Sequence, residues 1–308
     1  MAISNTKVSA TSLDRDVSSM FWDQYVDYPA DYSKIAKIVQ FTGNGMGNHI
    51  TKAELSPLGA LQEINEGGAI SFDNPVEGHK KTVYFTKYGL GFQITEEMLA
   101  DDLHQNYRNM PQKLAKSARY KVEALFWDLF NSGFATHTSA DGQYIFDTDH
   151  TTLKTGTTIS NDPTAASLSE TTLQAAFEYF DGLVDEAGNP IVMNPKYLVI
   201  PPALQWIAQK LHKGNYVVGS MNNDINTVNP ANLMDYSWTP FKTRWLTSKT
   251  AWYILSEDHD MELIWRFPVR LMSKGTDDFL TGNALYKATM RLAAAAWAFK
   301  GSYGNAGA

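Results

Sequence analysis

One long amphipathic helix constrains the fold of this chain more than any other sequence feature. Asn109 can cap a helix, Pro111 suits its first turn and Gly133 can end it, so we predict a helix over about 109–132. Its apolar side chains recur at helical spacing and form one stripe: Leu114, Ala118, Val122, Leu125 and Leu129, widened by Phe126 and Phe130. About 22 residues at 1.5 Å each give a helix of roughly 33 Å.

Aromatic residues crowd the segment before this helix. Phe21, Trp22, Tyr25 and Tyr28 precede Pro29, and three of these rings follow helical spacing. We expect an extended arm over residues 1–40, with at most a short helix before the proline. So many rings are rarely left in water, so they should pack either on the chain's own body or on a neighbouring molecule, and the residues leave both alternatives open.

Glycines recur throughout residues 43–91 and separate short segments that have high β-strand propensity. The polar tip Asn65-Glu66-Gly67-Gly68 separates Ala60–Ile64 from Ala69–Phe72, which predicts a long hairpin with turns or bulges. Because the faces of these strands are not strongly apolar, we expect the hairpin to project from the body.

The chain after the long helix combines helices and strands. Ser167-Leu168-Ser169-Glu170 predicts a capping box that opens a helix with Leu173, Phe177, Phe180 and Val184 on one face. Tyr197–Ile200 predicts a buried strand, and Pro201-Pro202 starts a third helix that Gly214 ends.

The last third of the chain is richer in strands. We predict them at Trp252–Leu255, Glu262–Arg266 and Arg270–Ser273. The segment Asn283–Lys300 is ambiguous, because its alanines favour a helix whereas its position after several strands favours another strand.

Composition excludes several classes of protein. The 308 residues are 44% hydrophobic and 12% aromatic, which allows a large core in one domain or two intertwined ones and argues against disorder. No cysteine is present, so disulfides and cysteine-bound zinc are excluded.

The longest apolar run, Leu292–Phe299, is far too short to cross a membrane, and residues 1–16 carry no secretory signal pattern, so we expect a soluble protein made inside the cell. The net charge of −7 is poorly suited to gripping nucleic acid over the whole surface.

Residues that could carry chemistry do not form a recognised motif. The glycines at 43, 45 and 47 have the wrong spacing for dinucleotide binding, and no Gly-x-Ser-x-Gly elbow is present. The clusters Asp147-x-Asp149-His150 and Glu257–Asp260 match no known metal spacing. We therefore expect neither an enzyme nor a cofactor. The distant alternative is a metal-dependent hydrolase that uses Asp147 and His150, or Asp258 and His259.

Four segments, in this order, carry a resemblance to a known family. They are Tyr88–Met98 with Asp101-Asp102, the long helix, Ile145–His150, and Pro195–Leu204 with Ala208. Together they resemble the Hong Kong 97-type major capsid proteins of tailed bacteriophages, and the Mu-like major head subunits most closely. The order and spacing of the segments carry the resemblance, which covers roughly residues 50–300.

The resemblance implies an α+β capsid fold with five segments. These are an N-terminal arm (1–48), an extended β-hairpin loop (49–88), a peripheral domain with the long "spine" helix (89–167), an axial α/β domain (168–265) and a return to the peripheral domain (266–308). It also implies that Asn283–Lys300 is a long peripheral strand, against its helical propensity.

The implied function is self-assembly into an icosahedral bacteriophage shell that encloses genomic DNA. Copies of the chain would form pentamers and hexamers in the host bacterial cytoplasm, with the help of a portal and a scaffold protein. The scaffold would be a separate protein, because the long helical scaffolding region that some relatives carry before the arm is missing here. Double-stranded DNA would be held without sequence-specific binding. The alternative within this fold is an encapsulin-like compartment that encloses a cargo enzyme.

We predict contacts between subunits at three places. They are the arm, the hairpin and an axial-domain loop near 221–235 that would face the centre of each ring of subunits. The residues are Phe21, Trp22, Tyr25, Tyr28, Glu66, Gly67, Gly68, Lys80, Lys81, Asn222, Asn223 and Asp224. Some relatives cross-link through a lysine in this hairpin. Lys80 and Lys81 occupy it here, but no motif marks their reaction partners, so we do not predict that chemistry.

Overall fold

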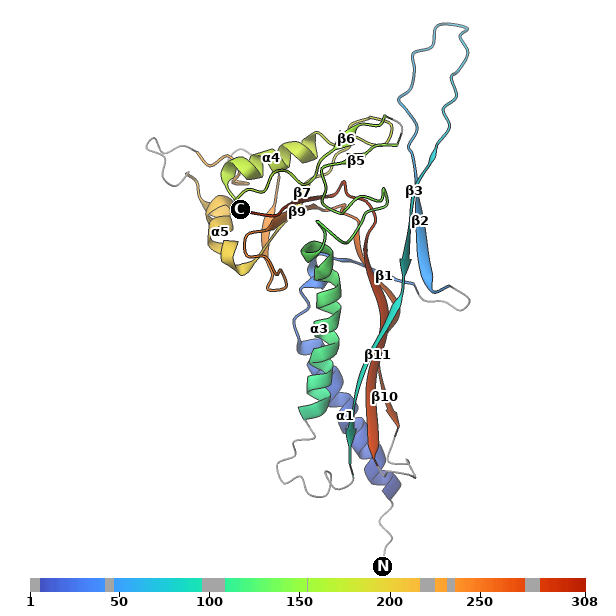
Figure 1. Ribbon diagram of the computed structural model, residues 1–308, viewed down its shortest axis with the longest axis vertical. Coiled ribbons are helices and arrows are strands. Elements are labelled where there is room, and N and C mark those ends of the chain that lie inside the picture. Colours follow the sequence, from blue (N-terminus) through green and yellow to red (C-terminus); the bar gives the residue numbers. More distant parts are fainter. Residues whose placement is uncertain are drawn as a thin grey trace, which may run out of the picture. The chain divides into compact units, whose positions relative to one another are not determined.

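The computed structural model forms two compact units, each built from three separate stretches of chain (Figure 1). The first unit comprises Met1–His49, Tyr84–Phe126 and Leu263–Ala294, and the second comprises Ile50–Val83, Trp127–Glu262 and Ala295–Ala308. The structure describes residues 6–41, 47–95, 109–153, 155–216, 225–231, 236–274 and 283–308. Among these residues, no helix combines the length and the hydropathy that a membrane span requires.

A four-stranded sheet forms the body of the first unit. Its strands are β1 (Lys37–Gln40), β4 (Thr86–Ile94), β10 (Met261–Lys274) and β11 (Ala284–Ala296), in the order β1-β10-β11-β4. β11 pairs antiparallel with β4, from Ala284 opposite Ile94 to Leu292 opposite Thr86. The ambiguous alanine-rich segment is therefore a strand, because pairing along its length outweighs its helical propensity.

β10 is a single strand of 14 residues, so the prediction of two separate strands over Glu262–Arg266 and Arg270–Ser273 is wrong. Pro268 lies between them and has no N–H to donate to a neighbouring strand. β10 nevertheless runs through the proline as one strand, beside the four-residue strand β1.

Two long helices belong to the first unit. α3 (Asn109–Asn131), whose last residues belong to the second unit, confirms the helix predicted over about 109–132 and buries Leu114, Val122 and Phe126. α1 (Thr6–Asp27) has 22 residues, so the expectation of at most a short helix before Pro29 is wrong. The proline lies beyond the end of α1 and terminates it without interrupting it. A short 3-10 helix, η1 (Tyr32–Lys34), follows.

The second unit is built around another four-stranded sheet, in the order β12-β9-β7-β8. β7 (Pro195–Ile200) runs parallel to β8 (Thr239–Lys242) and antiparallel to β9 (Trp252–Ser256), which pairs with β12 (Ser302–Asn305). The predicted strands at Tyr197–Ile200 and Trp252–Leu255 are confirmed. The helices are α4 (Glu170–Asp181) and α5 (Gln205–Lys213), which follows a 3-10 turn, η3 (Pro202–Leu204).

The capping box of α4 begins two residues later than the predicted one. Its N-cap is Ser169, whose hydroxyl accepts a hydrogen bond from the backbone N–H of Thr172, while the Thr172 hydroxyl accepts from the Ser169 N–H. Threonine thus replaces the expected glutamate as the reciprocal partner, and Glu170 is the first helical residue. α4 ends at Asp181, and the buried residue that follows it is Leu183, not Val184.

Two small antiparallel sheets complete the second unit: β5 (His150–Thr151) with β6 (Thr158–Ile159), and β2 (His49–Leu55) with β3 (Glu77–Tyr84). The β2–β3 pair is the base of the predicted hairpin. Ala60–Ile64 and Ala69–Phe72 are not strands, which corrects the sequence prediction. Pro57 and Pro75 stand just beyond the paired strands and cannot donate to a ladder.

Candidate functional site

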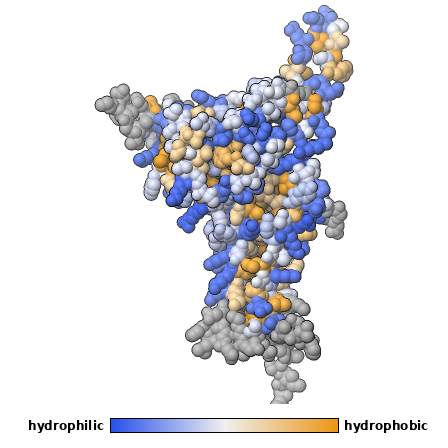
Figure 2. All heavy atoms as spheres, viewed as in Figure 1, coloured by the Kyte–Doolittle hydropathy of each residue, from blue (hydrophilic) through white to orange (hydrophobic). Residues whose placement is uncertain are grey.

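The segment between β2 and β3 exposes an unusual amount of apolar side chain. Every residue from 57 to 77 is exposed. The large apolar ones range from 47% exposure at Ile64 to 102% at Leu61 and are Leu55, Leu58, Leu61, Ile64, Ile70, Phe72 and Val76. Figure 2 shows hydrophobic surface along this segment. Single exposed leucines are ordinary, but a concentration of this kind marks an interaction surface.

Hydrogen bonds between the two limbs give this segment its shape. The backbone N–H of Ser56 donates to the Val76 carbonyl at 3.0 Å, and the Val76 N–H donates to the Ser56 hydroxyl at 2.9 Å. Further out, the Gly59 N–H donates to the carboxylate of Asp73 at 2.8 Å. The apolar side chains therefore lie on a loop that is held together by hydrogen bonds and has no hydrophobic core of its own.

The predicted tip residues form a tight turn. The N–H of Gly68 donates to the Asn65 carbonyl at 2.8 Å, with Glu66 and Gly67 between them. Gly67 has φ of +78°, which a side chain would disfavour. This is the geometry of a type II turn, and it accounts for a glycine at this position.

The two neighbouring lysines of the hairpin have different environments. Lys80 is exposed and pairs with Glu77 at 2.5 Å, whereas the ammonium of Lys81 donates to the carbonyls of Thr138 and Ala296. Burial lowers the pKa of Lys81 to about 8, although Asp141 opposes this shift. Within this pair, Lys80 is the lysine that a neighbouring molecule can reach.

The residues of the arm also differ in how far they are buried. Phe21 is fully buried within the first unit, and Trp22 is 38% exposed beside it, with the two ring centroids 5.2 Å apart. Tyr25 and Tyr28 are half-buried, and Val26, which the sequence prediction did not include, is 71% exposed. Phe21 thus completes the chain's own core, while Trp22 and Val26 lie at the surface.

Two residues of α3 hold the end of the arm. Arg119 donates to the Tyr25 carbonyl and to the Tyr32 hydroxyl, and the carboxylate of Glu123 accepts the backbone N–H groups of Asp31 and Tyr32. Glu123 is fully buried, so its hydrogen bonds are costly to break. Burial raises the pKa of Tyr25 to about 12 despite the neighbouring Arg119.

His150 belongs to a buried polar group and not to a cluster with Asp147. Its Nδ1 lies 2.6 Å from the carboxylate of Asp141, and its Nε2 lies 3.2 Å from the side-chain oxygen of Asn161. The Asn161 amide is oriented by donating to the carbonyls of Ile145 and Ser302. Both ring nitrogens therefore lie beside oxygen atoms that can accept hydrogen bonds, and the Asp141 carboxylate holds one of them.

Electrostatics around Asp141 agree with this arrangement. Burial alone would raise the pKa of Asp141, but hydrogen bonds from His150 and Ser139 and the charge of His150 hold it below its usual value. The His150 ring also stacks on Phe299 with centroids 3.9 Å apart. A histidine held on both nitrogens and on one ring face is a structural element of this unit.

Two further ion pairs, one buried and one partly exposed, were not foreseen from the sequence. Lys300 pairs with Glu186, and Lys52 pairs with Glu262 at 2.7 Å, while Glu262 also accepts the indole N–H of Trp297 at 2.6 Å. Their members are far apart along the chain, so no local pattern could reveal them. All of these residues belong to the second unit, so the pairs join its three separate stretches of chain.

Asp258 and His259, the second pair named for the distant hydrolase alternative, also make structural hydrogen bonds. His259 is buried, and its Nδ1 accepts the backbone N–H of Met261 at 3.2 Å, while the Asp258 N–H donates to the Ser256 hydroxyl at 2.9 Å. Within the described part of the chain, no three His, Asp or Glu side chains come together as metal ligands would.

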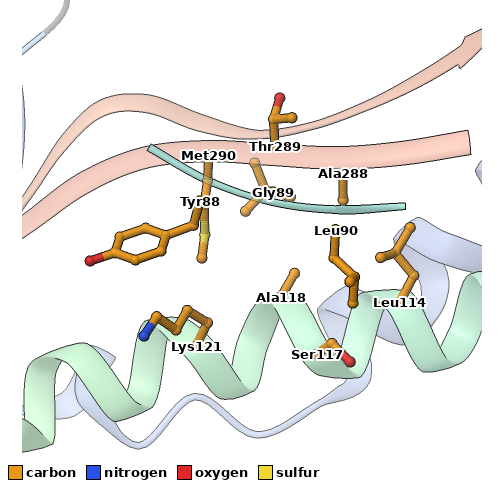
Figure 3. A pocket seen from close by; sticks show the side chains of 11 residues that line it. Tyr88, Gly89, Leu90, Leu114, Ser117, Ala118, Lys121, Ala288, Thr289 and Met290 are labelled. Atoms are coloured by element: carbon orange, nitrogen blue, oxygen red, sulfur yellow. The ribbon is translucent and has the colours of Figure 1, made fainter. Parts of the chain in front are cut away.

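An apolar cavity of about 270 Å³ lies between α3 and the sheet of the first unit (Figure 3). Tyr88 and Leu90 of β4, Met290 of β11 and Ala118 of α3 line it, and the Nζ of Lys121 lies 4.8 Å from the centroid of the Tyr88 ring. Its lining holds no carboxylate and no histidine. The cavity thus lacks an acid–base pair and suits apolar contact better than chemistry.

Asn222, Asn223 and Asp224, predicted to face the centre of a ring of subunits, lie outside the described residues.

Comparisons with known proteins agree with one another. A family model described as phage capsid protein matches residues 80–305. The Mu-like prophage FluMu major head subunit of Haemophilus influenzae is 26% identical over 130 residues, which cover 42% of this chain and 40% of that relative. The chain therefore matches well under two thirds of the curated relative.

Solved structures with the same fold come from several particles. The decorated capsid of bacteriophage JBD30 matches with a TM-score of 0.56 at 14% identity, over 71% of this chain and 91% of that chain. The virus-like particle of Pyrococcus furiosus matches with a TM-score of 0.52 at 9% identity, over 94% and 98%. At these identities the likeness concerns the fold.

Proposed function

Because this chain belongs to the phage capsid protein family, we propose that it is a major capsid protein that assembles into an icosahedral shell around genomic DNA. Its fold is the Hong Kong 97-type capsid fold. The family is one of structural proteins, so the chain acts through contacts with other molecules and not through catalysis.

The observation that supports this proposal best is the exposed apolar hairpin. Leu61 at 102% and Phe72 at 91% exposure gain nothing from folding of the isolated chain. Covering such side chains on a second copy removes apolar surface from water at about 25 cal/mol per Å². A hairpin that reaches a neighbour is therefore stabilised by assembly, and a shell provides a neighbour for every copy.

The proposed parts of the subunit follow the five segments introduced above. Residues 1–48 act as the arm, 49–88 as the extended loop, 89–167 with 266–308 as the peripheral domain, and 168–265 as the axial domain. In this proposal Trp22, Val26, the hairpin tip around Glu66 and Lys80 contact neighbouring subunits. The loop with Asn222, Asn223 and Asp224 would meet its symmetry mates at the centre of each pentamer or hexamer.

The proposed partners are first of all copies of the same chain. A scaffold protein and a portal would take part in assembly, and double-stranded DNA would be enclosed without sequence-specific contacts. A net charge of −7 agrees with the absence of tight DNA binding, because a protein that binds phosphate groups tightly needs a surplus of lysine and arginine. Assembly would take place in the host bacterial cytoplasm.

Expression in bacteria followed by sedimentation and negative-stain electron microscopy tests the proposal. We expect closed shells of uniform size, formed either by the chain alone or with a scaffold gene from the same locus. Protein that stays monomeric in both experiments would contradict the proposed function.

A second candidate is a compartment shell that encloses an enzyme. The virus-like particle of Pyrococcus furiosus motivates this candidate, because its chain has the same fold over 98% of its length. Nuclease treatment of shells purified from the native source separates the two functions: protected DNA supports the phage head, whereas a co-purifying enzyme without DNA supports the compartment.

A further inference from the structure

The sheet of the first unit has one face toward α3 and a second face on the opposite side. Successive side chains of a strand alternate between the two faces of its sheet. Leu90 and Met290 point toward α3, whereas Thr289 points to the other side (Figure 3). Arg291, two residues after Thr289, and Lys87, which lies directly opposite Arg291 on β4, therefore share the face that points away from α3.

Positive charge is concentrated on this sheet. Each of its strands β1, β4, β10 and β11 carries lysine or arginine, and together they contain one acidic residue, Glu262. Glu262 belongs to the second unit and pairs with Lys52. The whole chain, in contrast, has 26 lysines and arginines against 33 aspartates and glutamates. The sheet is thus a positively charged region of a negatively charged protein.

Three of these cations surround one hollow of about 420 Å³. Lys87, Arg270 and Arg291 line it together with Phe267, which is 40% exposed. The guanidinium of Arg270 lies over the Phe267 ring, with its central carbon 4.8 Å from the ring centroid. The Nε of Arg291 donates to the Phe85 carbonyl at 3.4 Å, which leaves both terminal NH₂ groups of that side chain as donors.

The charges around this hollow are not compensated within the subunit. In the part of the chain that the structure describes, no ion pair involves Lys87, Arg270 or Arg291. Lys87 and Arg291 are direct cross-strand neighbours, and like charges at such positions destabilise a sheet. An oxyanion in the hollow would remove this repulsion, and the planar fork of an arginine matches a phosphate group.

A second hollow, of about 670 Å³, continues the same surface. Met272 lines both hollows, and Lys287 lines the second. Lys287 precedes Arg291 by four residues on β11, which places the two on the same face about 13 Å apart. One phosphate group cannot reach both positions, whereas a nucleic-acid strand, with a charge about every 3.4 Å along the duplex axis, can. We call Lys87, Arg270, Lys287 and Arg291 the cationic face.

We propose that the cationic face binds the phosphate backbone of double-stranded DNA without reading its sequence. The inference rests on the proposed function, because a phage shell encloses DNA, and it names the surface that the DNA contacts. Phosphate contacts carry no sequence information, which agrees with a surface that offers only charge. The negative charge of the rest of the chain keeps the affinity low and confines the contact to this face.

Anisotropy of a fluorescein-labelled duplex titrated with the unassembled subunit tests the contact. Four phosphate contacts predict a slope of about −3.6 for log K against log salt between about 50 and 200 mM. A variant with Lys87→Gln, Arg270→Gln and Arg291→Gln retains one contact, so its slope should be about −0.9 and its affinity at low salt at least about tenfold weaker. Equal slopes and affinities would overturn the proposal.

A matched control removes the same charge elsewhere. Lys113, Lys116 and Lys249 are exposed and lie outside the cationic face, so replacing all three with Gln should leave the slope near the wild-type value. The melting temperature of each variant reports on folding. Inorganic phosphate should displace the duplex no better than chloride does at equal ionic strength. Displacement by phosphate at low millimolar concentration would assign the hollow to the free anion and overturn the assignment to DNA.

Shell formation separates this contact from assembly and from the proposed function. The triple variant of the cationic face should form shells with the wild-type yield. A folded triple variant that forms no shells would make the face a contact between subunits, for instance with an acidic segment of a second copy, and would overturn DNA binding there. Wild-type protein that forms no shells would contradict the proposed function, whatever the duplex titration gives.

Discussion

The guanidinium of Arg119 lies over the ring of Tyr25, with its central carbon 3.9 Å from the ring centroid, and its Nε donates to the Tyr25 carbonyl at 2.8 Å. The same side chain donates to the Tyr32 hydroxyl at 3.0 Å. One residue of α3 thus fixes the end of α1 and the turn that follows. Surfaces on the arm can serve assembly because the arm is held to its own unit in this way.

Replacing Arg119 with Met keeps the aliphatic packing and removes both hydrogen bonds and the contact with the ring. We expect the free energy of unfolding to fall by about 2 to 3 kcal/mol, the cost of losing charge-assisted hydrogen bonds. Urea denaturation of the unassembled subunit measures it, with Lys116→Met on the exposed side of α3 as the control. An equal, small effect in both variants would contradict the anchoring role of Arg119.

Phe21 and Trp22 are adjacent and should respond differently to truncation. Phe21→Ala empties a fully buried site and should lower the free energy of unfolding by about 3 to 5 kcal/mol. Trp22→Ala removes a ring that is 38% exposed, so the melting temperature of the unassembled subunit should stay within a few degrees while the yield of shells drops. A Trp22→Ala subunit as unstable as Phe21→Ala would place that ring in the core and remove it from the proposed interface.

Lys81 should make stability depend on pH in the alkaline range. Burial lowers its pKa from 10.5 to about 8, so the folded chain loses this proton before the unfolded chain does. The free energy of unfolding therefore gains a contribution that is absent below about pH 8 and grows to about 3 kcal/mol by pH 10.5. Tyrosines ionise in the unfolded chain over the same range, so the measurement is the difference between wild type and Lys81→Met. A difference that does not change with pH would refute the lowered pKa.

Asp141→Asn should weaken the buried polar group around His150. The substitution keeps the shape of the side chain but replaces the carboxylate that lies 2.6 Å from His150 Nδ1, and the loss of a hydrogen bond to a charged group typically costs about 1.5 to 3 kcal/mol. Asp149→Asn, at an exposed position close by, should change the free energy of unfolding by less than about 0.5 kcal/mol. If both variants unfold at the same urea concentration, Asp141 does not hold His150 in place.

Deleting Glu66–Ala69 tests the hairpin tip. All four residues are exposed and make no packing contacts to the body, so the unassembled subunit should unfold at nearly the same urea concentration as the wild type. Closed shells should nevertheless become rare, because the loop no longer reaches its neighbour with the same shape. Sedimentation distinguishes the outcomes, and a normal yield of shells from the deletion would argue against a role of the tip in assembly.

The sequence predicted α3, β7 and β9 because each has a local cause. Periodic apolar residues and end signals such as Asn109, Pro111 and Gly133 define α3, and a short apolar run bounded by prolines defines β7. The resemblance, and not the residues, resolved β11: its alanines favour a helix by propensity, and only pairing with β4 makes it a strand.

The sequence predictions were wrong where contacts between distant parts of the chain determine the structure. Nothing in the residues around Pro29 indicates that α1 extends back to Thr6, because the burial of Val17 depends on partners such as Ile94 and Tyr286 elsewhere in the chain. The same holds for Lys81 and His150, whose partners come from distant segments. Residue types can suggest that such groups matter, but only the folded arrangement assigns them to the core and not to a surface.

The strand order β1-β10-β11-β4 has a consequence for biosynthesis. Neither β1 nor β4 pairs with a strand made at about the same time: β4 ends at Ile94, and its partner β11 ends at Ala296. At typical translation rates of 5 to 20 residues per second, the ribosome needs about 10 to 40 s to cover that interval. The first unit therefore cannot close its sheet on a nascent chain, and α1 and α3 acquire their final setting only when synthesis is nearly complete.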